Sequence, residues 1–293
     1  MHQQTWLITG PSSGLGKALA SEALHTGHRV IGTTRDISRA ESSYPEFSAN
    51  GGIWICLDPA QNDAYDRFRD IAGEYSVDVL VNNAGYAFIG GVEDTDEDAV
   101  RSQMEVNFYG PLRAVRACLP VMRERKSGHI ILISSGAGFI ARPARSTYSA
   151  SKFAIEAIHE SLSQEVKSFG IKVLIVEPGA FRTPFPSRQI FPKGPGLERG
   201  YSDAYEGTAV EKMVRLSKDM GAARELIKGD PGKAARVVVG VVGGGYGDGF
   251  EGLRMPLGGD CVRALEGKIE ELRRDLEGSR GVAMGTDFDV DVD

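Results

Sequence analysis

The hydrophobic residues fall into short runs separated by longer stretches with helical spacing. The runs are rich in β-branched residues and almost continuously apolar, as is typical of strands covered on both faces. They are TWLIT (5–9), RVIGTT (29–34), IWICL (53–57), DVLVN (78–82), HIILIS (129–134) and KVLIVE (172–177). Between them, apolar residues recur at intervals of three and four, which predicts amphipathic helices. This alternation predicts an α/β fold: a single Rossmann-type, doubly wound parallel sheet of about seven strands with helices on both faces.

The chain after the sixth run predicts a long loop followed by two helices. Residues 182–212 begin with several prolines and glycines, and an irregular segment this long is typical of a lid over a binding site or of a disordered segment. We therefore expect these residues to form a substrate loop. Helical spacing is found over 207–228. Residues 229–242 predict a second helix with Asp230 as its N-cap and Pro231 at its first position.

The C-terminal region, 253–278, predicts one more strand and a long helix. A glycine-rich connection (243–252) leads to LRMPLG, where Pro256 restricts the strand to a sheet edge because proline has no N–H to donate. The helix carries an apolar stripe that we expect to pack on the domain, made of Val262, Leu265, Ile269, Leu272 and Leu276. The acidic end, 279–293, is expected to be disordered, so that residues 1–278 form a single domain.

Composition narrows the class of protein. The 293 residues are 41% hydrophobic and 25% charged, which are ordinary proportions for a globular protein. The net charge, 34 − 40 = −6, argues against nucleic acid as a partner because its phosphates attract basic proteins. Three scattered cysteines and five histidines without paired spacing predict neither a disulfide framework nor a metal site. No apolar run has the length of a transmembrane helix and the N-terminus lacks a signal-peptide pattern, so we expect a cytoplasmic protein without stable membrane insertion.

A glycine-rich turn follows the first run directly. Glycines permit positive φ and a close approach of pyrophosphate to the backbone, while a helix N-terminus offers free N–H groups to phosphates. The turn therefore predicts a dinucleotide site made of Gly10, Ser12, Ser13, Gly14, Leu15 and Gly16. The same stretch matches G-x-S-x-G, the nucleophile elbow of α/β-hydrolases, with Ser12 as the nucleophile. That alternative is weak, because the hydrolase triad needs a late histidine and the last one here is His159.

The end of the second run bears on which dinucleotide binds. Thr34 stands where an acid would hold the ribose of NAD, and Arg35 follows it. A guanidinium pairs with the 2′-phosphate that an acid would repel, which favours NADP(H). The alternative is that Asp36 reaches the ribose and that Arg35 is a solvated surface charge.

Four residues form a candidate catalytic group. Tyr148 and Lys152 lie one helical turn apart on the same face. Ser135 ends the fifth run, at the carboxyl edge where α/β sheets bind ligands, and Asn107 lies in the helix before that run. Each residue alone has a structural explanation, but their joint placement favours a catalytic site.

These motifs resemble the short-chain dehydrogenase/reductase family over about residues 5–185. The turn after the first run matches that family's T-G-x-x-x-G-x-G fingerprint, and Asn107, Ser135, Tyr148 and Lys152 match its catalytic tetrad. The resemblance implies an NADP(H)-dependent oxidoreductase. It also implies further cofactor contacts, namely Asp58 at the adenine, Asn83, Ala84 and Gly85 of an N-N-A-G segment, and Pro178, Gly179 and Thr183 at the nicotinamide carboxamide.

The resemblance further implies how a carbonyl is reduced. A phenol with its ordinary pKa of about 10 exchanges protons poorly at neutral pH, so a neighbouring ammonium that lowers this pKa assists it. Tyr148 is then the proton donor and Lys152 lowers its pKa; both lie at the nicotinamide ribose, which Lys152 holds. Ser135 hydrogen-bonds the carbonyl oxygen, and Asn107 positions Lys152 through a water.

The C-terminal third resembles the 17β-hydroxysteroid-dehydrogenase-like and retinol-dehydrogenase-like members of the family. This implies a lipophilic carbonyl or alcohol as substrate (steroid-, retinoid- or polyketide-like). The preference for NADP favours reduction, and the resemblance to the whole family implies a homo-dimer or tetramer. Candidate pocket residues are Phe139, Phe181 and Phe185, together with Phe191 and Tyr201. The alternative is an NADP-binding protein without redox turnover, either a regulator or a cyclase or isomerase. The complete tetrad argues against it.

Overall fold

The computed structural model describes residues 3–219, 227–244 and 250–288. Within these residues, seven strands form one parallel sheet in the order β3-β2-β1-β4-β5-β6-β7. The strands are β1 (Thr5–Thr9), β2 (Arg29–Thr34), β3 (Ile53–Cys56), β4 (Val79–Asn82), β5 (Gly128–Ile133), β6 (Ile171–Pro178) and β7 (Arg254–Leu257). The predicted fold class is confirmed, and β7, which contains Pro256, lies at an edge of the sheet as its proline requires.

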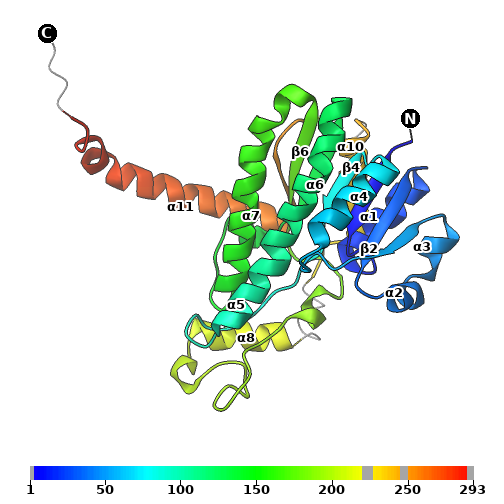
Figure 1. Cartoon of the computed structure of the whole chain (residues 1–293). Coiled ribbons are helices and arrows are strands. Elements are labelled where there is room, and N and C mark those ends of the chain that lie inside the picture. The colour runs from blue at the N-terminus through cyan, green and yellow to red at the C-terminus, as the bar shows by residue number, and fades with distance from the viewer. Residues whose placement is uncertain (1–2, 220–226, 245–249, 289–293) are drawn as a thin grey trace, which may run out of the picture.

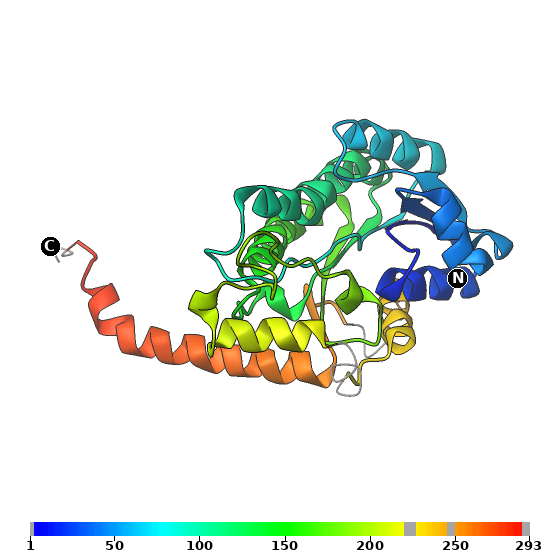
Figure 2. The same cartoon turned by 90° about the horizontal axis from the view of Figure 1, so that it is seen from below.

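Helices cover both faces of this sheet. The α-helices of the described residues are α1 (Gly14–His25), α2 (Ile37–Ser43), α3 (Pro45–Ala49), α4 (Ala64–Tyr75), α5 (Glu97–Met104), α6 (Gly110–Arg125), α7 (Ser146–Glu165), α8 (Ala209–Lys218), α10 (Pro231–Val242) and α11 (Gly259–Met284). Figures 1 and 2 show α1 and α10 together on one face and α4, α6 and α7 on the other, in agreement with the two large apolar clusters of the core. The sheet is therefore doubly wound.

Strand β1 shows why both faces have to be covered. Successive side chains of a strand point to opposite faces of the sheet. Trp6 and Ile8 belong to the cluster under α1 and α10, while Leu7 belongs to the cluster under α4 and α6, and all three are fully buried. A strand buried on both faces has an apolar residue at nearly every position, which is the pattern in the sequence.

The strand order places three candidate segments at one edge of the sheet. It reverses beside β1, which has β2 on one side and β4 on the other. In open α/β sheets, ligands bind at the carboxyl ends of the strands near such a reversal. The glycine turn after β1, the Asn83 segment after β4 and Ser135 after β5 all begin at this edge.

The predicted substrate loop is an irregular segment with two short 3₁₀ turns, Phe185–Arg188 and Asp203–Tyr205. It is joined to the segment after β4 by a bridge between Phe88 and Ile190. Helix α8 follows the loop. The rest of the predicted helical region includes residues 220–226, which lie outside the described residues.

Helix α10 begins as predicted from its cap and its proline. The Asp230 carboxylate accepts hydrogen bonds from the N–H groups of Gly232, at 2.8 Å, and Lys233, at 3.2 Å. Pro231 occupies the first turn, where a missing N–H costs nothing. The glycine-rich connection that follows includes residues 245–249, which the structure does not describe.

Helix α11 corrects two expectations. It extends away from the sheet (Figure 1), and its stripe does not pack on the domain: Ile269, Leu272 and Leu276 are 53%, 55% and 55% exposed. The reason is that the helix leaves the domain after its first turns, where Cys261 is buried. It also continues to Met284, so disorder from residue 279 is wrong for this helical part. Residues 289–293 lie outside the described residues.

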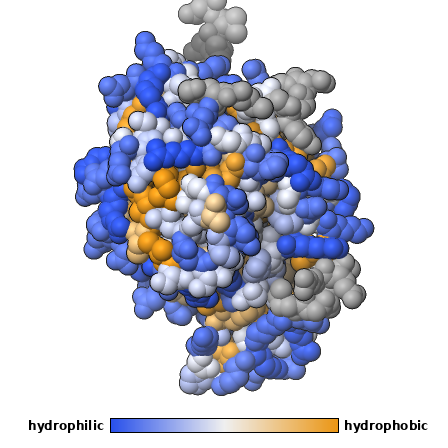
Figure 3. Space-filling view, turned by 90° about the vertical axis from the view of Figure 1, so that its right-hand side faces the viewer, coloured by the Kyte–Doolittle hydropathy of each residue, from blue (hydrophilic) through white to orange (hydrophobic). Residues whose placement is uncertain are grey.

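The surface is mainly hydrophilic on the side of α1, α2 and α3. Figure 3 shows this side, with apolar areas set among hydrophilic residues. In the part of the chain that the structure describes, no helix combines the length and the apolar character needed to cross a membrane.

Candidate active site

The glycine turn has the backbone conformation that its sequence predicts. Gly10 and Gly14 have φ of +65° and +60°, a region that favours glycine. Gly16 is required for a different reason: a Cβ there would overlap the Asn83 amide nitrogen and lie 2.9 Å from the carbonyl oxygen of Gly10. The turn is therefore closed tightly against the segment that follows β4.

The Asn83 segment holds this turn in place. The Asn83 side-chain amide donates hydrogen bonds to the carbonyl oxygens of Thr9, at 2.8 Å, and Gly10, at 3.2 Å. The hydroxyl of Thr9 accepts hydrogen bonds from the N–H groups of Asn83 and Ala84, both at 2.9 Å. These contacts give Asn83 and Ala84 a role in shaping the turn, whereas the sequence predicted them as cofactor contacts.

The N-terminus of α1 is free to bind an anion. Ser13 is its N-cap, but the Ser13 side chain makes no capping hydrogen bond, unlike the aspartate and threonine caps of α2, α5, α8 and α10. The N–H groups of the first turn, which follows Ser12 and Ser13, thus keep their hydrogen-bonding capacity and the positive end of the helix dipole. A dinucleotide phosphate fits this donor set and the glycine backbone beside it.

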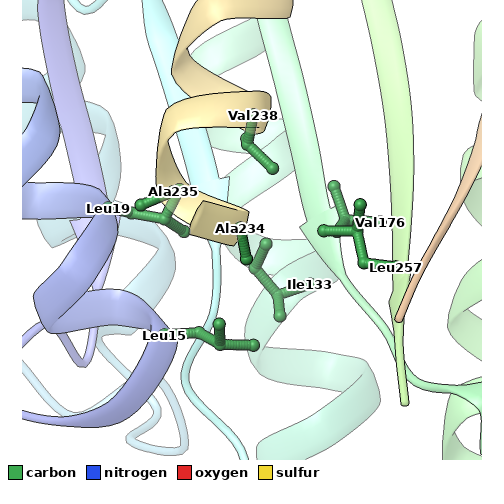
Figure 4. A pocket seen from close by; sticks show the side chains of 8 residues that line it. All are labelled: Leu15, Leu19, Ile133, Val176, Ala234, Ala235, Val238 and Leu257. Carbon is green, nitrogen blue, oxygen red and sulfur yellow. The ribbon is translucent and has the colours of Figure 1, made fainter. Parts of the chain in front are cut away.

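Leu15 is oriented away from such a phosphate. Its side chain lines a small cavity between α1, α10 and the sheet (Figure 4). All eight residues around this cavity are apolar: Leu15, Leu19, Ile133, Val176, Ala234, Ala235, Val238 and Leu257. A cavity without a polar group offers nothing for acid–base chemistry, so it is a packing feature of the core. Only the backbone of Leu15 remains as a candidate cofactor contact.

The residues after β2 include one engaged and one exposed charged side chain. The Asp36 carboxylate caps α2 by accepting a hydrogen bond from the N–H of Arg39, at 2.9 Å, so it is already engaged. Arg35 is exposed beside it at the carboxyl edge. Asp58 follows β3, and its carboxylate accepts a hydrogen bond from the N–H of Ala60, at 3.0 Å.

The structure brings three of the tetrad residues together. Tyr148 and Lys152 lie on α7 and are 4% and 5% exposed. The Ser135 side chain lies close enough to the Tyr148 phenol to lower its pKa. The Lys152 ammonium lies 6.0 Å from the centre of the Tyr148 ring and donates a hydrogen bond to the carbonyl oxygen of Ile133, at 2.9 Å. The end of β5 and the first half of α7 therefore place these three side chains in one buried polar cluster.

Burial shifts the pKa values of Tyr148 and Lys152. Burial raises the pKa of Tyr148 above its ordinary value, while the hydrogen bond with Ser135 and the charge of Arg145 oppose this effect. Burial also lowers the pKa of Lys152 to about 8, against the effect of the Glu156 charge. Lys152 therefore releases its proton more readily than an exposed lysine, because its ammonium group is removed from water. In this structure the phenol remains protonated at neutral pH.

Asn107 lies in a π-helical turn (Glu105–Tyr109) between α5 and α6. Pro111 explains this turn, because it has no N–H to bond to the carbonyl of Asn107 four residues earlier. The Asn107 amide donates hydrogen bonds to the carbonyl oxygen of Tyr86, at 3.0 Å, and to the hydroxyl of Ser151, at 3.1 Å. A Cβ on Gly85 would lie 3.0 Å from Asn107 Oδ1 and 3.9 Å from Lys152 Nζ, so Gly85 leaves room where these two residues approach each other.

A buried ionic cluster behind Lys152 was not predicted. Arg254 of β7 binds Glu156 and Glu177 at 2.6 Å each and the exposed Glu160 at 2.7 Å. Glu156 also accepts a hydrogen bond from Ser134, directly before Ser135. Burial and the Glu156 charge raise the pKa of Glu177 to about 7, and Arg254 opposes this.

The segment after β6 is held by the beginning of α11. The Asp260 carboxylate accepts a hydrogen bond from the N–H of Ala180, at 2.8 Å, and the N–H of Gly179 donates to the carbonyl of Leu257, at 2.9 Å. Further along, a Cβ placed on Gly14 would lie 3.5 Å from the Cβ of Thr183. The Pro178–Thr183 segment therefore runs from the sheet edge to the glycine turn, as a nicotinamide-binding segment requires.

The predicted pocket residues lie in three different places. Phe185 lies 6.1 Å from Tyr148 between ring centres, and Phe191 packs in the same apolar cluster, which also contains the buried Tyr201. Phe181, in contrast, is buried against Gly229 and near Gly258, so its ring belongs to the core. Phe139 lies next to Gly136, at the end of the turn that carries Ser135.

Comparisons with known proteins decide the family. Residues 4–190 match the short chain dehydrogenase family. The chain belongs to this family. Among curated proteins, oxidoreductase claN of Passalora fulva is 42% identical over 221 residues, which are 75% of this chain and 98% of claN. Retinol dehydrogenase 8 of Bos taurus is 32% identical over 251 residues, covering 82% of this chain and 78% of that enzyme.

Solved structures agree with this assignment. A short-chain dehydrogenase from Streptomyces avermitilis is 36% identical, with a TM-score of 0.85 over 98% of this chain and 100% of its own. A metagenomic short-chain oxidoreductase in complex with NADP is 32% identical, with a TM-score of 0.56 over 61% of this chain and 83% of its own. This short-chain dehydrogenase therefore has the oxidoreductase fold of its relatives, and the hydrolase interpretation of Ser12 finds no support.

The histidine that a hydrolase would need is also unsuitable. His159 is buried within α7, with Nδ1 2.8 Å from the carbonyl oxygen of Ile155, and burial lowers its pKa to about 4. Among the described residues, no group of histidine, cysteine or carboxylate side chains is arranged to hold a metal ion.

Proposed function

We propose that this chain is an NADP(H)-dependent reductase that interconverts a ketone or aldehyde and an alcohol on a lipophilic small molecule. The observation that carries the proposal is the placement of the Ser135 side chain at the Tyr148 phenol, whose pKa it lowers, with Lys152 beside them, at the same sheet edge as the uncapped N-terminus of α1. A proton donor and an anion-binding turn at one edge are what carbonyl reduction by a dinucleotide requires.

The preference for NADP(H) rests on the residues after β2. Asp36 is engaged as a helix cap, which leaves the exposed Arg35 as the charged side chain available to a 2′-phosphate. The NADP complex of the metagenomic relative supports this choice. The bound cofactor supplies the hydride. The backbone N–H groups of α1 and the Pro178–Thr183 segment orient it.

The side chains supply the proton and its path. Tyr148 gives its phenolic proton to the carbonyl oxygen, and Ser135 donates a hydrogen bond to the same oxygen as negative charge develops there. Lys152, whose pKa is lowered to about 8, exchanges protons near neutral pH. Asn107 lies between Lys152 and the Tyr86 segment and is suited to hold a water that returns the proton.

The apolar cluster around Tyr148 favours a lipophilic substrate. It combines Ala87 and Ile89 after β4 with Phe185, Phe191 and other apolar side chains of the substrate loop and α8. Retinol, in the name of one relative, is itself a lipophilic alcohol. We further propose a cytoplasmic location and a homo-oligomeric state, in line with the family resemblance.

The test is to follow NADPH oxidation with a panel of lipophilic and small polar ketones. We expect turnover of lipophilic ketones with NADPH, and a loss of about 10²–10⁴-fold in kcat for Tyr148→Phe because the proton donor is removed. Tyr75→Phe, at the other end of the sheet on α4, is the matched control and should keep full activity. Arg35→Ala should weaken NADPH binding about tenfold to hundredfold and leave NADH binding unchanged.

Other outcomes would reverse the proposal. If thermal shift shows that NADPH binds but no ketone is turned over, the result would favour a regulator or a cyclase or isomerase on the same fold. Full activity of Tyr148→Phe would exclude this tyrosine as the proton donor. Equal effects of Arg35→Ala on NADPH and NADH would contradict the 2′-phosphate role.

A further inference from the structure

The outer part of α11 has no described contact with the domain. Every residue from 269 to 288 is exposed, whereas the start of the helix packs on β7 and on the turn that carries Ser135. With 26 residues the helix is about 39 Å long. Figures 1 and 2 both show it extending beyond the sheet and its covering helices. A second helix can therefore lie along it.

The apolar residues of α11 follow the spacing of a coiled-coil seam. They alternate at intervals of three and four along the helix, as Val262, Leu265, Ile269, Leu272 and Leu276. In the heptad notation these are successive a and d positions. Val262, Ile269, Leu272 and Leu276 are 39–55% exposed, and a continuous apolar row on a monomer marks an interaction surface.

We propose that α11 packs against α11 of a second copy of this chain, with the two helices antiparallel. In this arrangement Ile269 packs against Leu272 of the second copy, and Leu265 packs against Leu276. The row is self-complementary because the same pairs recur on the other side of the two-fold axis. A partner helix of identical sequence thus buries the stripe from Leu265 to Leu276.

The charges beside the seam favour the antiparallel orientation. The e and g positions of a coiled coil set the orientation of the partner helix. With Ile269 opposite Leu272, Lys268 lies beside Asp275 of the second copy and Glu266 lies beside Arg273. All four of these flanking contacts, two on each side of the axis, join opposite charges.

A parallel pair of α11 helices is less favourable. In that orientation a g residue meets the next e residue of its partner. Lys268 would then meet Arg273 of the second copy, which places two cations together on each side of the seam. In the single chain Lys268 binds Glu271 and Arg273 binds Glu277, but these pairs are exposed and exchange easily for contacts across a seam.

The oligomeric state of the full chain tests this proposal. Sedimentation velocity over a range of concentrations should show self-association, and Leu272→Glu should weaken it by about 100-fold or more, because each pair of helices then contains two charges in its seam. Arg274→Glu, on the outer face of the same helix, is the matched control and should leave the association unchanged. Circular dichroism should show unaltered helix content in both variants.

A charge reversal distinguishes the two orientations. Lys268→Glu should weaken the antiparallel pair, because it faces Asp275, and adding Asp275→Lys should restore the association. In a parallel pair, Lys268→Glu would instead strengthen the association by facing Arg273. A wild-type monomer at every concentration, an unchanged mass for Leu272→Glu, or a stronger association of Lys268→Glu would each overturn the proposal. An unchanged mass would assign the oligomer to another surface, such as the helices before β5 and β6.

Discussion

Gly16 shows how a single hydrogen atom decides the geometry of the cofactor turn. Gly16→Ala would push a methyl group into the Asn83 amide and against the Gly10 carbonyl oxygen. We expect it to lower the free energy of unfolding by about 2 kcal/mol, because the Asn83 hydrogen bonds to Thr9 and Gly10 would break. It should also weaken NADPH binding.

Gly73→Ala is the matched control for this prediction. Gly73 lies in α4, and a Cβ there would meet nothing within 4 Å. Replacing glycine by alanine inside a helix stabilises it by about 0.5–1 kcal/mol. Urea unfolding of both variants measures the two effects. If Gly16→Ala and Gly73→Ala unfold with the same free energy, the contact between Gly16 and Asn83 is not close.

Glu177 makes stability depend on pH. Its folded pKa of about 7 lies above the ordinary 4.5, so the folded chain binds more protons than the unfolded chain between these values. The stability that this group contributes is full below pH 4.5 and is lost as pH rises through about 7. Glu177→Gln should remove this dependence, which amounts to roughly 3 kcal/mol at most.

Urea unfolding at several pH values between 4.5 and about 7 measures this effect. Glu160→Gln is the control, because Glu160 binds the same Arg254 from an exposed position. It should leave the pH dependence in place. If the difference in stability between the wild type and Glu177→Gln is the same at every pH, the prediction is contradicted.

At the residue scale, local spacing predicted that Ser135, Tyr148 and Lys152 lie together, but it did not predict the ionic cluster. Tyr148 and Lys152 are neighbours on one helix, and Ser135 follows a strand whose carboxyl edge the alternation already defines. Glu156 and Arg254, in contrast, are 98 residues apart and meet only because β7 joins the sheet beside β6. No local pattern in the sequence carries that information.

At the scale of elements, the first turn of α11 holds the segment after β6, which we propose binds the nicotinamide. Asp260 holds the N–H of Ala180, two residues after Pro178. Asp260→Ala leaves that N–H without its charged acceptor, so we expect NADPH to bind about tenfold more weakly while the fold persists. Fluorescence titration with NADPH measures this change.

Glu270→Ala, an exposed residue further along the same helix, is the matched control and should bind NADPH normally. Equal affinities of the two variants would mean that the segment keeps its position without Asp260.

The strands and most helices could be predicted because their apolar periods are local. The direction of α11 could not, because the period of an amphipathic helix shows which face is apolar but not what covers that face. The alternation of Val262, Leu265 and Ile269 is equally consistent with packing on the same chain and with packing on another. Which of the two occurs depends on where the helix leaves the domain. No local pattern in the sequence indicates that position.

At the scale of the whole molecule, the outer part of α11 is separable from the sheet domain. Deleting residues 268–293 removes no described contact with the domain beyond the first turns of the helix. At concentrations low enough to keep the chain monomeric, we expect the free energy of unfolding to change by less than about 0.5 kcal/mol. Ketone reduction should persist, while self-association is lost.

Urea unfolding and sedimentation of the truncated chain measure both effects. A large loss of stability at low concentration would show that α11 supports the sheet domain within a single copy. The intact chain, diluted to the same concentration, is the control.

Phe185 has a consequence for which molecules are reduced. Its ring packs beside Tyr148, so the phenol is nearly sealed from solvent before anything enters. We expect a substrate that reaches Tyr148 to displace that ring, and the displaced ring then needs a new apolar neighbour. A steroid-sized molecule offers one, whereas acetone-sized compounds do not. We therefore expect the enzyme to select its substrates when they bind, because an apolar substrate replaces the contact between Phe185 and Tyr148 with an apolar contact of its own.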